Sequence, residues 1–187
     1  MDSDSIGIAI IGTGRAGMIH AGNFARNVKR AHVAALAGPV PESLQTAQLE
    51  LGVGKTYTDY RRAIEELGVH AIVIAKPTSL HREITEAAAA AGKHVFCEKP
   101  MAMREEECDA MVRATEAAGV VLQIGFMRRF DRSFRDAKAR IEQGEIGEVV
   151  QVKTHTHGPS YPRPWMFDLA RSNASANGVR FFFEFAE

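Results

Sequence analysis

The segment IGIAIIGTGRAG, residues 6–17, joins a short apolar run to the motif G-x-G-x-x-G. The apolar run predicts a buried strand, and the helical spacing of the apolar residues after residue 17 predicts that a helix follows at once. In that setting Gly12 permits the tight turn, Gly14 lets the backbone approach a pyrophosphate, and Gly17 allows the helix to pack closely on the sheet. The free N–H groups of the helix start would then face the phosphates. The segment predicts a dinucleotide-binding turn, with cofactor contacts from Gly12, Thr13, Gly14, Arg15, Ala16 and Gly17.

The rest of the first 125 residues repeats one pattern, in which an apolar run is followed by an amphipathic helical segment. Such alternation is typical of parallel strands whose crossover helices cover both faces of a sheet. We therefore predict an α/β fold with a doubly wound parallel (Rossmann) sheet in a domain spanning residues 1–125. The predicted strands cover residues 6–11, 32–37, 55–57, 70–75, 93–97 and 120–125, and the later predicted helices cover residues 41–51, 59–67, 79–91 and 104–118.

Beyond residue 125 the pattern changes. The apolar positions Phe134, Ala137 and Ile141 predict one further helix that ends at Gly144. Residues 149–157 alternate apolar and polar side chains with period two, which is typical of an antiparallel strand with one wet face. Residues 126–187 are thus predicted to hold a connecting helix and the start of an α+β second domain, an incomplete substrate or oligomerisation domain that begins near residue 145.

Composition narrows the class of ligand. The chain has 187 residues, 45% of them hydrophobic and 25% charged, and its formal net charge is zero. A neutral chain has no electrostatic footprint for nucleic acid or for an anionic membrane surface. The sequence shows no signal peptide, no apolar run of membrane-spanning length and no disulfide framework. We expect a cytoplasmic protein that binds a small molecule.

Two local patterns imitate other sites. Residues 52–56, GVGKT, look like the end of a phosphate-binding P-loop, but the first glycine of that motif would fall at Leu49, inside a predicted helix. His155 and His157 have a spacing compatible with a metal ion, yet no nearby Cys, Asp or Glu completes a site. We therefore predict no metal site. Cys97 and Cys108 are interpreted as small apolar fillers.

The carboxyl ends of three successive predicted strands carry polar side chains. Thr78 and His81 follow the strand at residues 70–75, Lys99 follows the strand at residues 93–97, and Arg128 follows the strand at residues 120–125. Open α/β sheets bind ligands at this edge. A lysine there can donate a hydrogen bond to a substrate hydroxyl and, if it is desolvated, exchange its proton near neutral pH. Lys99 is therefore the predicted catalytic residue.

At these positions the sequence resembles the Gfo/Idh/MocA family of NAD(P)-dependent enzymes, named after glucose-fructose oxidoreductase and inositol dehydrogenase. The resemblance covers residues 6–170, and its most specific mark is the Glu-Lys-Pro at residues 98–100. The segments that carry it are GTGRAG (12–17), PTSLH (77–81), AGKHVFCEKP (91–100) and GFMRRFD (125–131).

This resemblance implies an oxidoreductase that moves a hydride between NAD or NADP and a sugar, inositol or related polyol. It implies that Lys99 lies beside the nicotinamide and the reacting carbon of the substrate, and that Glu98 contacts the nicotinamide ribose. It further implies a Lys99–Pro100 peptide that can be cis and homo-oligomers in full-length members. The remaining implied contacts are Pro77, Thr78 and His81 along the cofactor and Arg128 at the substrate.

The sequence departs from the family pattern in three places. Gly38 stands at the end of the second strand, where members that prefer NAD carry an acidic residue for the ribose 2′-OH, and no arginine stands beside it for a 2′-phosphate. The cofactor choice between NAD and NADP therefore stays open. Met127 stands where the family often has asparagine. The resemblance implies Asp and His residues in a second domain that hold the substrate and accept the proton. The match fades after residues 165–171, residues 172–187 carry no histidine, and the ending at residues 180–187 is rich in aromatic residues.

We therefore expect a truncated form, with the cofactor half present and the proton acceptor of the second domain missing. The alternative is a nucleotide-binding or redox-responsive regulatory module without catalysis, and a product without function is a third option. The missing histidine favours the regulatory alternative. The intact Glu98-Lys99-Pro100 segment argues against it, because a pure binder has little need for a lysine at the hydride site.

Overall fold

One parallel sheet organises the molecule, of which the computed structural model describes residues 5–153. Its strand order is β3-β2-β1-β4-β5-β6, so the order reverses between β1 and β4, where open sheets of this kind bind their ligands. All five strand pairs are parallel, which confirms the predicted doubly wound sheet. The strands are β1 (Ile6–Ile11), β2 (Ala31–Ala37), β3 (Thr56–Tyr57), β4 (Ala71–Ile74), β5 (His94–Cys97) and β6 (Leu122–Ile124).

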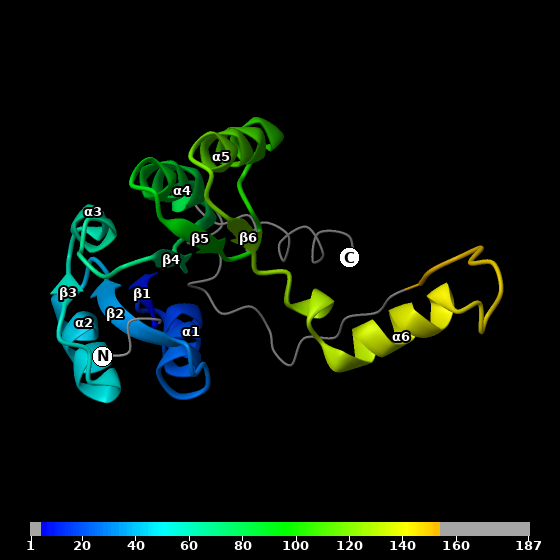
Figure 1. Cartoon of the computed structure of the whole chain (residues 1–187), viewed down its shortest axis with the longest axis horizontal. Helices are drawn as coiled ribbons and strands as arrows, with labels where there is room; N and C mark the ends of the chain where they lie inside the picture. Colours follow the sequence, from blue (N-terminus) through cyan, green and yellow to red (C-terminus); the bar gives the residue numbers. More distant parts are fainter. Residues whose placement is uncertain (1–4, 154–187) are drawn as a thin grey trace, which may run out of the picture.

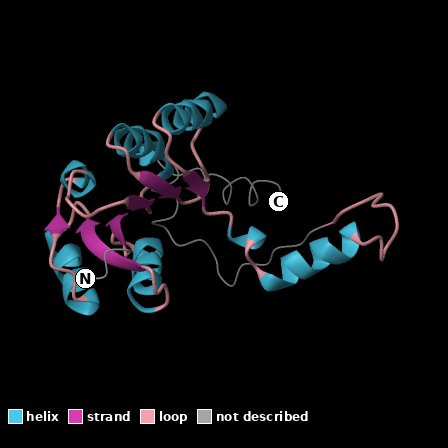
Figure 2. Cartoon of the chain, viewed as in Figure 1, coloured by secondary structure: helices cyan, strands magenta, loops and turns pink. Residues whose placement is uncertain are grey.

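Helices cover both faces of this sheet, as Figures 1 and 2 show. One face carries α1 (Arg15–Arg26) and α2 (Pro41–Leu51), and the other carries α3 (Tyr60–Ile64), α4 (His81–Ala90) and α5 (Glu105–Ala117). A short 3-10 helix, η1 (Thr78–Leu80), precedes α4. Each face has its own cluster of buried apolar side chains, one around Ile10 and Leu36 and the other around Ile74 and Ile84.

Local sequence signals set most of the element boundaries. Pro41 begins α2, and Gly52, with a φ of 68°, ends it in the left-handed conformation that glycine adopts without strain. Helix α3 ends earlier than predicted. Leu67, counted as part of its apolar face, is 88% exposed because the helix has already given way to a turn at Gly68.

After β6 the chain leaves the sheet. It forms the 3-10 helix η2 (Met127–Arg129) and then α6 (Arg132–Glu142), which projects away from the other helices in Figure 1. We call residues 5–125 the sheet domain and residues 126–153 the arm. Every residue of the arm is exposed or half-buried. The strand predicted at residues 149–157 is absent over its described part, 149–153, because no described strand lies beside these residues to supply hydrogen bonds.

Several expectations fall on residues that the structure does not describe. His155, His157 and the aromatic-rich segment 180–187 lie outside the described residues. Within residues 5–153, no helix is both long enough and apolar enough to cross a membrane.

Candidate functional site

The glycines of the turn between β1 and α1 have different reasons to be glycine. Gly12 has a φ of +112°, and a Cβ built on it would lie 2.3 Å from the carbonyl oxygen of Ala75 at the end of β4. A Cβ on Gly17 would lie 1.7 Å from the carbonyl oxygen of Gly12. The fold itself therefore requires these two glycines. Gly14 differs, because a Cβ there would meet no atom within 4 Å.

Gly14 is also the N-cap of α1, and its lack of a side chain leaves the start of that helix uncovered. The first N–H groups of a helix have no partner within the helix, and they carry its positive partial charge. The first turn of α1 contains no acidic residue, while Arg15 and Ala16 are exposed on it. The turn therefore offers uncovered N–H donors and one guanidinium group to an anion.

A pair of hydroxyl groups occupies the end of β2. Gly38 is buried there, and its N–H donates to the carbonyl oxygen of Tyr57. A Cβ on Gly38 would lie 2.9 Å from Oγ1 of Thr13, which is itself 2.8 Å from Oγ of Ser43. The structure thus brings Thr13, from the predicted pyrophosphate turn, next to Gly38, the position predicted to bear on the ribose 2′-OH. It adds Ser43, which the sequence analysis missed because nothing in the first turn of α2 marks it.

The loop after β4 is held by a buried histidine. His81 is 1% exposed, and its ring nitrogens face backbone carbonyls on two loops. Nε2 lies 2.8 Å from the oxygen of Lys76, and Nδ1 lies 3.0 Å from the oxygen of Pro100. This geometry gives His81 an internal role, tying the loop after β4 to the loop after β5, and its expected contact with a cofactor stays a prediction. Of its two expected companions, Thr78 is buried at the start of η1 and Pro77 is half-buried before it.

Lys76 is a second basic residue at this edge. Its side chain passes beside the glycine turn, so that a Cβ on Gly12 would lie 3.4 Å from its Cδ. Partial burial lowers the pKa of Lys76, because its ammonium group has lost some of its hydration. An anion bound at the turn would compensate for that loss. The sequence analysis did not single out Lys76, since an isolated lysine after a strand carries no signal of its own.

The Glu-Lys-Pro segment follows β5, and its Lys99–Pro100 peptide is cis. The carboxylate of Glu98 is held at both oxygens: Oε1 lies 2.8 Å from Nε2 of His20, and Oε2 accepts the backbone N–H of Lys99 at 3.0 Å. Lys99 is exposed. Within the described part of the chain, no residue bonds its ammonium group.

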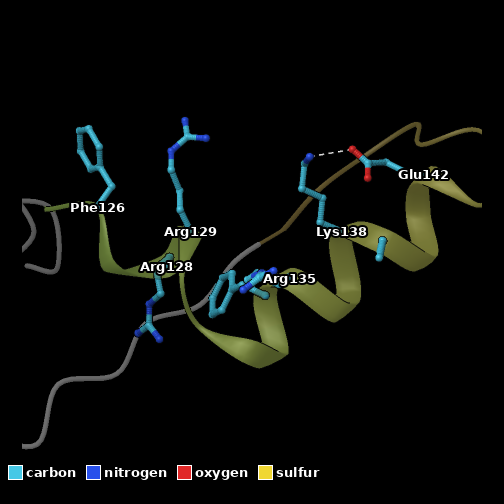
Figure 3. Close-up of a pocket in the computed structure, with 8 residues that line it drawn as sticks. Phe126, Arg128, Arg129, Arg135, Lys138 and Glu142 are labelled. Carbon is cyan, nitrogen blue, oxygen red and sulfur yellow. Dashed lines mark ion pairs between the residues drawn. The ribbon is translucent and has the colours of Figure 1, made fainter. Parts of the chain in front are cut away.

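The arginine predicted to contact substrate has its partners within its own segment. Arg128 is on the arm, where its guanidinium lies 4.9 Å from the ring centre of Phe134 and 3.6 Å from Asp131. It lines an open hollow of about 730 Å³ between η2 and α6, and it points away from Arg129 in Figure 3. No bond between Arg128 and Lys99 is found among the described residues. The structure therefore does not bring the two predicted substrate residues into contact.

The two cysteines have no place in this chemistry. Cys97 is fully buried at the end of β5, and burial raises the pKa of its thiol to about 12. Desolvation also raises the pKa of Cys108, which is half-buried. Both thiols therefore stay protonated at neutral pH, as expected for cysteines that fill space.

Similarity to known proteins identifies the family of this chain. Residues 6–126 match the model of an oxidoreductase family, Gfo/Idh/MocA, described by its NAD-binding Rossmann fold. The chain belongs to the Gfo/Idh/MocA family. It is 37% identical over 154 residues to the scyllo-inositol 2-dehydrogenase (NAD(+)) of Bacillus subtilis, and 37% identical over 155 residues to the myo-inositol 2-dehydrogenase of Thermotoga maritima.

Solved structures of this family have a fold similar to that of this chain. The scyllo-inositol dehydrogenase of Lactobacillus casei, determined with bound NAD(H) and scyllo-inositol, superposes with a TM-score of 0.74 at 38% identity. That alignment covers 77% of this chain and 43% of the Lactobacillus casei chain. The Bacillus subtilis enzyme is likewise matched over 82% of this chain but over only 45% of its own length. The chain thus spans less than half the length of these Gfo/Idh/MocA relatives.

Proposed function

We propose that the sheet domain binds NAD or NADP and is the cofactor-binding half of a dehydrogenase that acts on a sugar, inositol or related polyol. The observation that carries this proposal is the open space around Gly14. The fold would accept a side chain there, yet the position is bare, and it lies between the uncovered N–H groups of α1 and the end of β1. A dinucleotide pyrophosphate is the ligand that such a bare position suits.

The residues along the edge fit the other parts of the cofactor. Gly12, Gly17, Arg15 and Ala16 shape the pyrophosphate turn, and Thr13, Gly38 and Ser43 meet at the adenosine ribose. On the other side of the switch point, Pro77 and Thr78 border the loop after β4, and Glu98 and Lys99 follow β5. When bound, the nicotinamide ring donates or accepts the hydride.

Lys99 is the proposed catalytic residue. Its ammonium group is exposed at the carboxyl edge of the sheet, on a loop fixed by His81 through Pro100 and by Glu98 through the backbone N–H of Lys99. There it would donate a hydrogen bond to the substrate hydroxyl, orient the C–H bond toward the cofactor and take part in moving the hydroxyl proton. Arg128, on the arm, is proposed to help close the substrate site.

The substrate class comes from the relatives. Those compared above are named as inositol dehydrogenases, and they are more than twice as long as the matched region. A walled site that excludes water, and the base that accepts the hydroxyl proton, are proposed to come from sequence beyond the matched half. Homo-oligomer formation and a cytoplasmic location stay predictions.

Titration of NADH fluorescence with this chain tests cofactor binding. The wild-type chain should give a saturable change with NADH or NADPH, and Gly14→Val should abolish it, because the new side chain would occupy the pyrophosphate position. Gly54→Val is the matched control: Gly54 is also exposed, with no atom within 4 Å of its Cβ position, but it lies away from the edge. Absence of any response to either cofactor at millimolar concentration, in a folded sample, would refute the assignment.

A nucleotide-binding module without catalysis is the second candidate. The buried apolar residues of both clusters lie within the sheet domain, so this region can hold a nucleotide without the rest of an enzyme. A chimera that adds the second domain of a close relative separates the two candidates. Turnover of inositol or a sugar that disappears on Lys99→Ala supports the enzyme, and a chimera that binds NADH but never turns over supports the module.

A further inference from the structure

His20 lies on α1, five residues beyond the start of that helix, and it reaches across to the end of β5. Its Nε2 atom lies 2.8 Å from Oε1 of Glu98, and its ring packs edge-on against Phe96 with a centroid distance of 5.1 Å. The side chains of His20 and Glu98 are each 22% exposed. This partial shielding strengthens the hydrogen bond relative to one on the open surface.

Three elements together fix the Glu98 carboxylate. Helix α1 contributes His20 and the backbone after β5 contributes the Lys99 N–H. Gly125, directly after β6, lies close on a third side, because a Cβ there would lie 3.4 Å from Cδ of Glu98. A carboxylate has about four acceptor positions, of which these two hydrogen bonds use two. Glu98 also lines an open hollow of about 310 Å³ together with His20 and Phe96, from which a ligand would reach the carboxylate.

We propose that His20 is a positioning residue, which holds the Glu98 carboxylate in the orientation that accepts hydrogen bonds from the nicotinamide ribose. The inference rests on the proposed cofactor site. Its physical basis is that His20 belongs to the helix whose start receives the pyrophosphate. The bond to Glu98 therefore sets the carboxylate at a defined place relative to the phosphate-binding turn, so that it is pre-positioned for the ribose of a dinucleotide bound there. Neither G-x-G-x-x-G nor Glu-Lys-Pro includes this residue.

A purely structural role is the competing explanation, because His20 also packs on Phe96. The two roles differ in which half of the cofactor they affect. If His20 acts through Glu98, its loss weakens contacts to the nicotinamide ribose and leaves the adenosine diphosphate half untouched. If it only holds α1 against the sheet, its loss displaces the phosphate-binding turn and weakens both halves alike.

The experiment measures the affinity of the chain for NADH and for ADP, which lacks the nicotinamide ribose. His20→Leu should weaken NADH binding about tenfold and ADP binding less than about twofold. His20→Gln, whose amide can place a donor near the position of Nε2, should recover most of the NADH affinity. Asn23→Ala, an exposed change on the same helix, is the control and should alter neither affinity.

A double-mutant cycle with Glu98→Ala completes the test. In the Glu98→Ala background, His20→Leu should cause no further loss of NADH affinity. An equal loss in both backgrounds, or an equal loss for NADH and ADP, would overturn the inference while leaving the cofactor site in place. If His20→Leu does not fold, a His20→Gln variant that loses NADH and ADP affinity equally gives the same refutation. Failure of the wild-type chain to bind either ligand would overturn the proposed function and this inference with it.

Discussion

The sheet domain and the arm treat their apolar side chains in opposite ways. In the sheet domain, Ile10, Leu36, Ile72 and Ile74 are fully buried between helices that the same domain supplies. In the arm no described residue is buried, and its large apolar side chains face outward from η2, from α6 and from the segment after it. They include Phe126, Met127, Phe130, Phe134, Ile141, Ile146, Val149, Val150 and Val152.

The two regions therefore differ in whether their apolar side chains find packing partners within the same region. The sheet domain buries its own apolar side chains, because its helices cover the strands that precede them. The arm instead exposes its large apolar side chains, and two of them, Phe126 and Phe134, share a hollow with charged residues. Here the basic rim is formed by Arg128, Arg129, Arg135 and Lys138 around the hollow of Figure 3.

The largest predicted effect is a loss of stability in the sheet domain. Gly17→Ala should lower the free energy of unfolding by at least about 3 kcal/mol, because its Cβ would lie 1.7 Å from a backbone oxygen that cannot move without opening the turn. Urea unfolding measures this. Gly14→Ala, in the same turn, should change the unfolding free energy by less than about 0.5 kcal/mol. Equal effects of the two changes would show that the turn is not packed as described.

We expect residues of the sheet domain alone to determine the preference between NADH and NADPH. Gly38 supplies neither repulsion for a 2′-phosphate nor a carboxylate for a 2′-OH, so we expect NADH and NADPH affinities to differ by about tenfold or less. Gly38→Asp should favour NADH, because a carboxylate there can accept a hydrogen bond from the ribose 2′-OH. Because its Cβ would lie 2.9 Å from Oγ1 of Thr13, the change should work best together with Thr13→Ala.

Competition between the two cofactors measures this preference. Phe134→Ser, on the arm, is the control and should leave the ratio of the two affinities unchanged. A wild-type chain that already rejects NADPH by a thousandfold would mean that another residue reads the ribose.

Asp59 in the sheet domain and Asp131 in the arm both cap the start of a helix, so the loss of each cap can be compared between the two regions. Asp59 accepts the N–H of Arg61 at the start of α3, and Asp131 accepts the N–H of Ser133 at the start of α6, both at 3.0 Å. Loss of such a cap costs about 1 kcal/mol. Asp59→Ala should therefore lower the unfolding free energy of the sheet domain by about that amount, because α3 buries Ala63 and Ile64.

Asp131→Ala should instead reduce the helical signal of α6 in far-UV circular dichroism and leave the main unfolding transition in place. A shift of that transition equal to the shift caused by Asp59→Ala would show that the arm unfolds together with the sheet domain. The contrast between the two regions would then not hold in solution.

The parts of this structure that the sequence predicts are those specified by neighbouring residues. Helix α2 has the predicted bounds because Pro41 and Gly52 mark its two ends locally. The sheet follows from the alternation of apolar runs with helices. The strand expected at residues 149–157 could not be judged in the same way, since a strand needs a partner, and period-two alternation does not say whether one is present.

The candidate site likewise has parts specified by neighbouring residues and parts that depend on distant ones. The glycine turn and Glu-Lys-Pro are local motifs, so the sequence predicts them. The His20–Glu98 contact joins residues 78 positions apart, and only the crossing of α1 over the sheet brings them together. The burial of His81 could not be predicted either, because a histidine after a strand can face the ligand or the core, and packing decides between the two.

Alkaline pH should produce the smallest effect, and only in the sheet domain. Burial, and then a hydrogen bond to Glu83, raise the pKa of Tyr60 from 10.0 to about 12. Between pH 10 and pH 12 the unfolded chain releases this proton while the folded chain keeps it, so stability that is complete below pH 10 is lost as the pH rises. The arm contains no tyrosine. Because Tyr60 is partly exposed, we expect a difference of about 1 kcal/mol or less between wild type and Tyr60→Phe.

Urea unfolding of the two proteins at pH 9 and pH 11 measures this difference. The unfolding free energy of wild type should fall more steeply with pH than that of Tyr60→Phe. The hydrogen bond from Tyr57 to Glu66, which raises the pKa of Tyr57 as well, is present in both proteins and cancels from the comparison. Parallel pH dependences would show that the Tyr60 hydroxyl is as well hydrated in the folded chain as in the unfolded one. The hydrogen bond from Tyr60 to Glu83 would then add nothing to the stability of the folded chain, and Arg61 would remain as the link from α3 to Glu83 on α4.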